Sequence, residues 1–304
     1  MDTRVTFQLS PWIAARLAEV DSALDAWVGR DAPAGLGEAM RYAVLDGGKR
    51  LRPLLVMAAS EAVAGNAAAA LRAACAVELI HAYSLVHDDM PCMDNDILRR
   101  GKPTVHVKFG QAQALLAGDA LQALAFEFLT PEGPEVPPAT QAALCRLLAR
   151  AAGHAGMAGG QAIDLASVGL ALSEDELRHM HRLKTGALLQ GSVTMGAACG
   201  HAGAQATAAL EGYGAALGLA FQVVDDILDV TADSATLGKT AGKDAAQDKP
   251  TYVSLLGLER SRGHARELLA QALAALDESG LPSTGEHSTQ ALRALAGMVV
   301  NRDK

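Results

Sequence analysis

The sequence predicts an all-α protein, and three observations lead to this fold class. Half of its 304 residues are hydrophobic, and only 4% are aromatic. Alanine is abundant, and long apolar stretches are joined by short Gly or Pro breaks, which favours helices over many short strands. No long polar linker divides the chain, so we expect a single domain over residues 1–304.

Helices are expected along the whole chain, with ends placed to within ~2–4 residues. The expected ranges are 10–29, 35–64, 67–90, 104–129, 138–156, 173–200, 203–230, 251–278 and 286–302. In the third range, apolar side chains at helical spacing mark a buried face: Cys75, Leu79, Ala82 and Val86. Pro131 and Pro134 close the fourth helix, and Ser173 with Glu176 matches a capping box at the start of the sixth.

Composition and charge exclude several classes of protein. The net charge is −8, the basic clusters are short and no aromatic residues alternate with them, so nucleic acid is not an expected partner. Residues 1–20 carry charges and lack the apolar core of a signal peptide, so a cytoplasmic location is expected. The four cysteines show no metal-like spacing and are expected to be reduced packing residues: Cys75, Cys92, Cys145 and Cys199.

An uncharged stretch at 185–210 has the length of a membrane span. Polar residues interrupt it: Gln190, Ser192, His201 and Gln205. The glycines at the ends of 200–203 predict a turn. We therefore expect two buried core helices here and no membrane insertion.

The first acidic cluster contains Asp88, Asp89 and Asp94, directly after the apolar part of the helix 67–90. Pro91 is expected to end this helix, so that Asp94 folds back beside it. Helical spacing places one row of side chains on the face that leads to the cluster: Glu78, His81, Leu85 and Asp88.

The second acidic cluster contains Asp225, Asp226 and Asp229, with Gln222 one helical turn before Asp225. Crowded carboxylates raise one another's pKa unless cations lie among them. Paired aspartates are usually just solvated helix ends, but here both clusters directly follow long apolar segments. Mg²⁺ is commonly held by one or two carboxylates together with substrate phosphates, so the clusters suggest a Mg²⁺–diphosphate complex.

Basic groups that could bind phosphate flank both clusters along the chain. They are Lys49, Arg52, Arg99, Arg100, Lys184, Lys239 and Lys249. Arginine can bind phosphate oxygens in pairs, and lysine adds a point charge. Each basic motif by itself is weak, because such groups are commonly solvated turns. Their order around two aspartate clusters is what favours a diphosphate-binding role.

These motifs together resemble the polyprenyl synthetase family, in particular the bacterial farnesyl diphosphate synthases. The similar stretches are GGKRLRP, DDMPCMD, LRRGKPT, GGQAIDL, KTG and FQVVDDILD. The resemblance covers nearly the whole chain. It implies a barrel of about ten antiparallel helices around a deep central cavity, a homodimer, and three Mg²⁺ ions that hold an allylic diphosphate.

The resemblance also implies roles for individual residues. Asp88, Asp94 and Asp225 would be metal ligands, supported by Asp89, Asp226 and Asp229. Cations that would neutralise the departing allylic diphosphate are Arg99, Lys184 and Lys239. Residues that would bind isopentenyl diphosphate are Lys49, Arg52, His81 and Arg100. Dipoles that would face the allylic carbocation are the Lys184 carbonyl, Thr185 and Gln222.

Three of these assignments have a plain alternative. His81 could be a packing histidine, although its position in the row toward Asp88 favours a ligand role, and His87 is treated as structural. The segment that carries Lys239 and Lys249 is as well explained by a solvated loop as by a flap that closes over the diphosphates.

Product length is expected to depend on Tyr83 and Ser84, which precede Asp88 by five and four positions, or about 6–8 Å along the helix axis. An aromatic ring there resembles synthases of the fifteen-carbon farnesyl diphosphate. The twenty-carbon geranylgeranyl product is the alternative, and Tyr83 could also be simple core packing.

Enzymes of a different class use two Glu-x-x-His pairs, and this chain contains two: Glu78 with His81, and Glu176 with His179. That spacing is typical of di-iron carboxylate bundles. We disfavour a di-iron bundle for this chain, because Glu176 belongs to the capping box and the aspartate clusters would have no role in such a protein. A non-catalytic subunit and a terpene cyclase are disfavoured by the complete pair of aspartate motifs and by the second set of cations.

Overall fold

The computed structural model describes residues 7–45, 47–231 and 250–302, and within these ranges the protein is almost entirely helical. The helices are α1 (Leu9–Trp27), η1 (Pro33–Gly35), α2 (Leu36–Val44), α3 (Leu51–Ala62), α4 (Ala67–Asp88), α5 (Val105–Phe109), α6 (Gln111–Leu129), α7 (Pro138–Ala152), α8 (Met157–Ala166), α9 (Glu174–His181), η2 (Arg182–Gly186), α10 (Ala187–Ala198), α11 (Ala204–Thr231), α14 (Tyr252–Leu256), α15 (Leu258–Glu278) and α16 (Gln290–Val300). The predicted all-α class is confirmed.

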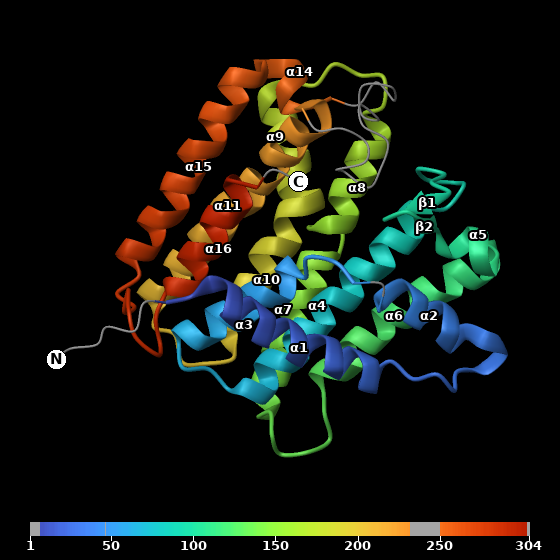
Figure 1. The fold of residues 1–304 in the computed structure, drawn as a ribbon, viewed down its shortest axis with the longest axis horizontal. Coiled ribbons are helices and arrows are strands. Elements are labelled where there is room, and N and C mark those ends of the chain that lie inside the picture. Colours follow the sequence, from blue (N-terminus) through green and yellow to red (C-terminus); the bar gives the residue numbers. More distant parts are fainter. Residues whose placement is uncertain (1–6, 46, 232–249, 303–304) are drawn as a thin grey trace.

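The long helices pack around α10, which lies in the middle of the molecule (Figure 1). α10 contacts α3, α4, α7 and α11, while α6 packs against the outer side of α4 and α15 against α11. Figure 1 shows α15 along one flank and α5 with the short strands at the opposite side. Both helices that lead to the acidic clusters, α4 and α11, therefore touch the same central helix.

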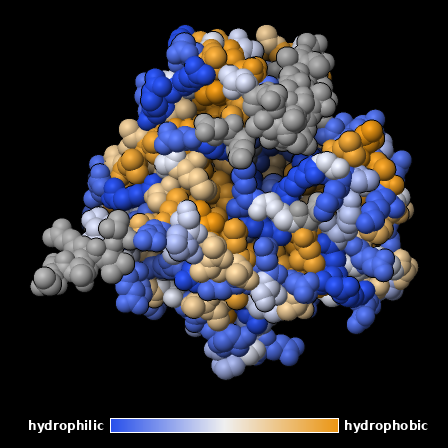
Figure 2. Space-filling view, viewed as in Figure 1, coloured by the Kyte–Doolittle hydropathy of each residue, from blue (hydrophilic) through white to orange (hydrophobic). Residues whose placement is uncertain are grey.

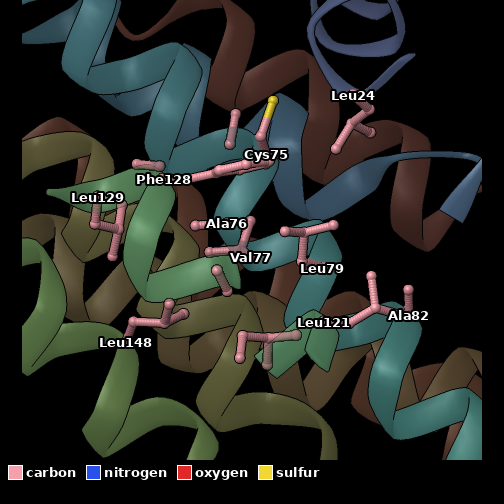
Figure 3. Packing of buried hydrophobic residues seen from close by; sticks show 14 of the residues in the cluster. Leu24, Cys75, Ala76, Val77, Leu79, Ala82, Leu121, Phe128, Leu129 and Leu148 are labelled. Atoms are coloured by element: carbon pink, nitrogen blue, oxygen red, sulfur yellow. The ribbon is translucent and has the colours of Figure 1, made fainter. Parts of the chain in front are cut away.

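The largest core cluster lies where α4 meets α1, α6 and α7. Figure 3 shows Leu24 from α1, Leu79 from α4, Phe128 from α6 and Leu148 from α7 pointing toward one another. All four side chains are at most 6% exposed. Burying one such side chain contributes ~1.5–3 kcal/mol, so this packing fixes the helix that carries the first acidic cluster.

α4 is also the one helix in the described part of the chain that is long and apolar enough to cross a membrane. Its most apolar stretch is 72% buried inside the protein. The 185–210 stretch forms α10, a turn and the start of α11, as expected, and most of α10 is buried. Burial against neighbouring helices accounts for the apolar composition of α4.

Four of the expected helices are each divided in two. The range 35–64 was wrong as one helix, because a loop with positive φ at Gly47, Gly48 and Arg50 separates α2 from α3. The ranges 104–129 and 251–278 break at Gly110 and Gly257, whose φ values of 90° and 79° favour glycine. The sequence already contained these glycines, so the breaks could have been predicted.

The range 173–200 is interrupted by the π-helical turn η2, which separates α9 from α10. α8 was not expected at all, because two glycines near its start gave it a weak helical signal. The capping box of Ser173 and Glu176 at the start of α9 is confirmed. α6 ends at Leu129, in agreement with the two prolines that follow.

A small hairpin not expected from the sequence follows the first acidic cluster. β1 (Leu98–Arg99) pairs antiparallel with β2 (Lys102–Pro103). The turn between them has positive φ at Arg100 and Gly101. All four cysteines are free thiols, and Cys75 and Cys199 are buried as expected, but Cys92 is exposed and does not pack.

Candidate active site

The first acidic cluster forms where α4 ends. Asp88 is the last residue of the helix, and the Asp94 N–H donates a hydrogen bond of 2.8 Å to the Asp88 carbonyl. The chain after Pro91 thus folds back over the helix end, as predicted. Asp89 is buried, and the Arg99 guanidinium from β1 donates to both oxygens of its carboxylate at 2.6–3.0 Å. Asp89 and Arg99 therefore form a fixed pair beside Asp88.

The Asp88 carboxylate lies in surroundings that favour an added cation. Burial, with the help of Asp94 and Asp89, raises the pKa of Asp88 to about 6, although Lys184 and Arg99 partly oppose the rise. A divalent cation would offset both the burial and the repulsion between carboxylates. Oxygen ligands of this kind suit Mg²⁺, so the residues fit a metal that is completed by substrate phosphate.

A cleft of about 520 Å³, partly open to solvent, lies along the face of α4 that carries His81 and Leu85. Its lining includes Glu78, His81 and Leu85 from α4 and Arg99 and Arg100 from the hairpin. The predicted row on α4 thus faces this cleft, with Asp89 rather than Asp88 at its end. Figure 2, which views the same side of the molecule as Figure 1, shows a hollow with hydrophilic side chains around it.

The loop before α3 lies against the hairpin at the edge of this cleft. The Arg100 guanidinium donates to the Gly47 carbonyl, and a Cβ on Gly48 would come within 2.8 Å of the same guanidinium. Gly48 has a φ of 126°, so its backbone conformation favours glycine, and a side chain there would displace the Arg100 guanidinium. Lys49 next to it is exposed. Two basic motifs far apart in the sequence are in this way brought together.

His81 lies within a group of arginines. Burial lowers its pKa well below the ordinary value, and Arg52, Arg100 and Arg99 lower it further. The imidazole is therefore neutral at physiological pH, and a neutral ring can donate one hydrogen bond to a phosphate oxygen. Of the other three residues expected to bind isopentenyl diphosphate, Arg52 and Arg100 are within electrostatic reach of His81.

Arg50 was overlooked in the sequence because its neighbours Lys49 and Arg52 carried the motif. Its buried guanidinium donates to Glu78 at 2.7 Å, to Asp21 at 3.1 Å and to the Val44 carbonyl at 2.7 Å. The φ of Arg50 is 47°. Arg50 thus anchors the start of α3 to α1 and α4, and its charge is already used inside the protein.

Lys184 and Thr185 lie in η2, the π-helical turn. Such turns are often found at functional sites because they alter the backbone hydrogen bonding. The turn is packed tightly against two glycines. A Cβ on Gly160 of α8 would be 2.0 Å from the Lys184 backbone nitrogen, and a Cβ on Gly218 of α11 would be 2.8 Å from the Gly186 Cα. The backbones of these two glycines, which carry no side chain, therefore fix the position of the turn.

The Lys184 ammonium bonds to the buried Asp164 carboxylate at 2.6 Å. Asp164 belongs to the GGQAIDL stretch of α8 and was not expected to take part in the site. Lys184 also acts electrostatically on Asp88. The lysine thus lies between a carboxylate of α8 and the first acidic cluster.

A chain of hydrogen bonds joins η2 to the second acidic cluster on α11. The Thr185 hydroxyl donates to Gln222 Oε1 at 2.9 Å, and Gln222 Nε2 donates to Asp226 Oδ1 at 2.8 Å. The Tyr252 backbone N–H donates to the other oxygen, Asp226 Oδ2, at 2.8 Å. Asp226 is only 2% exposed. Its carboxylate therefore positions Gln222 and Thr185.

Asp225 and Asp229 do not present themselves equally, although they share a helical face. The Asp225 side chain is 41% exposed, whereas Asp229 is only 4% exposed. Arg302, close to the C-terminus, bonds to the Asp225 carboxylate. Asp225 is thus the accessible carboxylate of the second cluster, and the basic residue Arg302 lies on it.

Tyr83 and His87 lie on the side of α4 that faces α6. Their rings meet edge to face with centroids 5.7 Å apart, and His87 Nε2 is 3.0 Å from the Leu115 carbonyl. His87 therefore packs, as expected. The Ser84 hydroxyl donates to the His81 carbonyl of its own helix. Neither Tyr83 nor Ser84 lines the 520 Å³ cleft, and their role in product length stays a prediction.

Two expected substrate-binding residues, Lys239 and Lys249, lie outside the described residues. In residues 7–45, 47–231 and 250–302, no three His, Cys, Asp or Glu side chains converge closely enough to hold a metal by themselves. The di-iron alternative therefore has no ligand set there: Glu78 is paired with Arg50, and Glu176 is bonded to Ser173.

The helices bring together paired aspartates, the hydrogen-bonded Thr185 and Gln222, and a basic cleft. This arrangement defines an all-α protein that is suited to phosphorylated substrates. A model of the polyprenyl synthetase family matches residues 33–281. The chain belongs to this family.

Several members of the family resemble the chain over most of its length. The farnesyl diphosphate synthase of Escherichia coli is 49% identical over 269 residues, which are 88% of this chain and 89% of that protein. A chloroplast geranylgeranyl pyrophosphate synthase of Capsicum annuum is 44% identical over 302 residues, 99% of this chain and 80% of that protein. Both named products thus occur among similar proteins.

Solved structures show the same fold. An FPP/GFPP synthase of Zymomonas mobilis superposes with a TM-score of 0.84 at 42% identity, covering 96% of this chain and 98% of that one. Geranylgeranyl pyrophosphate synthetase of Pyrococcus horikoshii gives a TM-score of 0.85 at 32% identity, covering 97% and 98%.

Proposed function

We propose that the protein is a short-chain trans-prenyltransferase that condenses dimethylallyl or geranyl diphosphate with isopentenyl diphosphate to give farnesyl diphosphate. The observation that carries this proposal is the pairing of two different polar surfaces around α4. One is acidic, with Asp88 and Asp94 at the helix end, and the other is a basic cleft lined by His81 and Arg100. Two diphosphates of different chemistry need two such surfaces.

Asp88, Asp94 and Asp225 would hold Mg²⁺, three ions by resemblance to the family. When bound, these ions compensate the charge that develops on the departing allylic diphosphate. Lys184 adds a cation next to Asp88. Because Asp164 already holds this lysine at 2.6 Å, its ammonium is pre-oriented toward the site and little side-chain freedom is lost on substrate binding.

The allylic carbon becomes positively charged when its C–O bond breaks. Thr185 and Gln222 are hydrogen-bonded to each other, so their remaining lone pairs are held in fixed directions and can stabilise that charge. Asp226 keeps Gln222 in this orientation from the far side. Isopentenyl diphosphate, bound by Lys49, Arg52, His81 and Arg100, supplies the alkene that attacks the cation. Loss of a proton to the released diphosphate completes the condensation.

Further parts of the proposal rest on the family and on composition. We propose a homodimer, since exposed leucines on α6 offer an apolar contact surface, and a cytoplasmic location. We propose a fifteen-carbon product, because Tyr83 stands where a ring would shorten the space for the growing chain. Twenty carbons is the alternative, given the geranylgeranyl synthases among the similar proteins.

The test is chromatography of the products formed from dimethylallyl and isopentenyl diphosphates with Mg²⁺. Farnesyl diphosphate as the main product supports the proposal, and geranylgeranyl diphosphate selects the alternative. Incubation with the allylic substrate alone is the control. Release of diphosphate together with a cyclised product in that control would show a terpene cyclase and refute the transferase.

A further inference from the structure

Arg302, near the C-terminus, makes three contacts with α11. It follows α16, and its side chain is only 11% exposed. One terminal nitrogen, Nη2, donates to the Asp225 carboxylate and also to the Phe221 carbonyl at 3.1 Å. The centre of the guanidinium lies 4.1 Å from the centroid of the Phe221 ring.

All three contacts come from one turn of α11, because Phe221 and Asp225 are four residues apart. A carboxylate, a backbone carbonyl oxygen and an aromatic face together suit a guanidinium, which is planar and stacks on rings while its N–H groups bond to oxygen. The contacts on α11 therefore form a specific binding site for the Arg302 side chain, and they are more than a surface ion pair.

This binding site includes the most accessible carboxylate of the second acidic cluster, that of Asp225. A divalent cation on Asp225 would meet the positive guanidinium at hydrogen-bond distance, and like charges so close repel each other. Arg52 acts electrostatically on Asp225 as well. In the protein without metal, this carboxylate is thus already compensated by cations of the chain itself.

We propose that Arg302 is a further residue of the metal–diphosphate site, where it holds Asp225 in the metal-free protein and competes with the divalent cation for that carboxylate. This inference rests on the proposed function, since that function assigns Asp225 as a metal ligand. Its consequence is that metal alone binds weakly, and that a cation bound at Asp225 releases Arg302 from α11.

The test is a titration of the full-length protein with Mn²⁺, followed by the electron paramagnetic resonance signal of free Mn²⁺, with no substrate present. We expect Arg302→Gln to bind Mn²⁺ about fivefold more tightly than the wild type, a coupling at the lower end of what linked sites show. Arg293→Gln is the matched control, because Arg293 of α16 is paired with Asp277 on the distant part of α15. We expect it to bind as the wild type does.

Each result separates the inference from the function on which it rests. Unchanged or weaker Mn²⁺ binding in Arg302→Gln overturns the inference, and an equal gain in Arg293→Gln does so too, because it would reveal a simple effect of net charge. Asp225→Asn tests the underlying assignment. If that variant binds Mn²⁺ like the wild type, Asp225 is no ligand and the metal assignment itself falls. Circular dichroism confirms that each variant is folded.

Discussion

At the scale of single residues, the two aspartates that are expected to hold metal make the most direct test. Asp88→Ala and Asp225→Ala should each abolish turnover while helical content is retained, because each removes a proposed metal ligand without removing a helix-packing side chain. A loss of several kcal/mol of transition-state stabilisation is expected, and ~1.4 kcal/mol is already tenfold in rate. Steady-state kinetics and circular dichroism measure both effects.

Asp119→Ala supplies the control for these variants, since Asp119 is an exposed aspartate on α6 outside the site. It should keep the wild-type rate. Wild-type turnover in Asp88→Ala or Asp225→Ala would contradict the metal assignment.

Tyr83 tests product length. We expect Tyr83→Ala to shift the product from fifteen carbons to twenty or more, because the missing ring leaves room for the chain to grow. Tyr83→Phe is the control, and it should keep the wild-type product since it keeps the ring and its edge-to-face contact with His87. Unchanged products in an active Tyr83→Ala would show that the ring does not limit the chain.

His181 makes the stability of the fold depend on pH. Burial, with a smaller effect of Lys184, lowers the pKa of His181 to about 4, although Asp164 partly opposes this. Between pH 6.5 and 4 the unfolded chain binds a proton at this residue that the folded protein does not, so this contribution to stability falls as the pH falls. The loss approaches roughly 3 kcal/mol near pH 4.

His181→Phe should remove this part of the pH dependence, because phenylalanine can still stack on Tyr252 but cannot be protonated. Denaturant unfolding of both proteins at pH 7.5, 6 and 5 measures it. The variant should gain on the wild type as the pH falls, and parallel curves would speak against the assignment.

At the same scale, the sequence was sufficient to propose groups whose chemistry is visible in their own side chain and spacing. Asp88, Asp94 and Asp225 belong to this kind, and their role as metal ligands stays a prediction. It was insufficient for residues that act through a partner from elsewhere in the fold. Asp164 matters because α8 places it on Lys184, and Tyr252 matters through its backbone, which no side-chain pattern reveals.

At the scale of elements, the π-helical turn η2 depends on a backbone contact with α8. Gly160→Ala would place a methyl group 2.0 Å from the Lys184 nitrogen, so η2 and α8 must move apart. We expect kcat to fall at least tenfold, which is ~1.4 kcal/mol, and the free energy of unfolding to fall by ~1–3 kcal/mol from overpacking.

Gly263→Ala on α15 is the matched control, because its new methyl group would have no neighbour closer than 4.0 Å. Alanine has the higher helix propensity, so this variant should be slightly more stable than the wild type and equally active. A Gly160→Ala enzyme with normal kcat would show that the position of η2 is not critical.

The elements themselves show which physical signals are local. Apolar periodicity placed α4 and α11 almost to the residue, because those helices are long and buried. The breaks at Gly110 and Gly257 were missed, since the apolar pattern continues across them while one residue with positive φ changes the direction of the chain. η2 could not be foreseen, because its turn is imposed by packing against Gly160 and Gly218.

At the scale of the whole molecule, an apolar surface is left open on the side of α5 and α6. Leu115 and Leu116 of α6 are 46% and 51% exposed, Val107 of α5 is 49% exposed, and Leu98 of β1 is 57% exposed. Exposed apolar side chains that gather into a patch commonly mark a protein–protein interface. This is the surface on which we place the proposed homodimer contact.

Leu116→Arg should shift the protein from dimer to monomer, because it would place two like charges in a desolvated contact. Light scattering coupled to size-exclusion chromatography measures the mass. Leu170→Arg is the control, since Leu170 is at least as exposed, at 58%, but follows α8, and this variant should stay a dimer. A Leu116→Arg protein of unchanged mass would place the interface elsewhere.

The hydrogen bond between the Tyr252 N–H and Asp226 has a consequence for how the protein tolerates change over evolutionary time. A donor that belongs to the main chain survives replacement of the side chain by any residue other than proline. The links from Thr185 to Gln222 and from Gln222 to Asp226 have no such protection, because each is made by side chains. As long as Asp226 is retained, drift in the sequence can therefore alter Thr185 and Gln222 while the bond between Asp226 and the Tyr252 N–H persists.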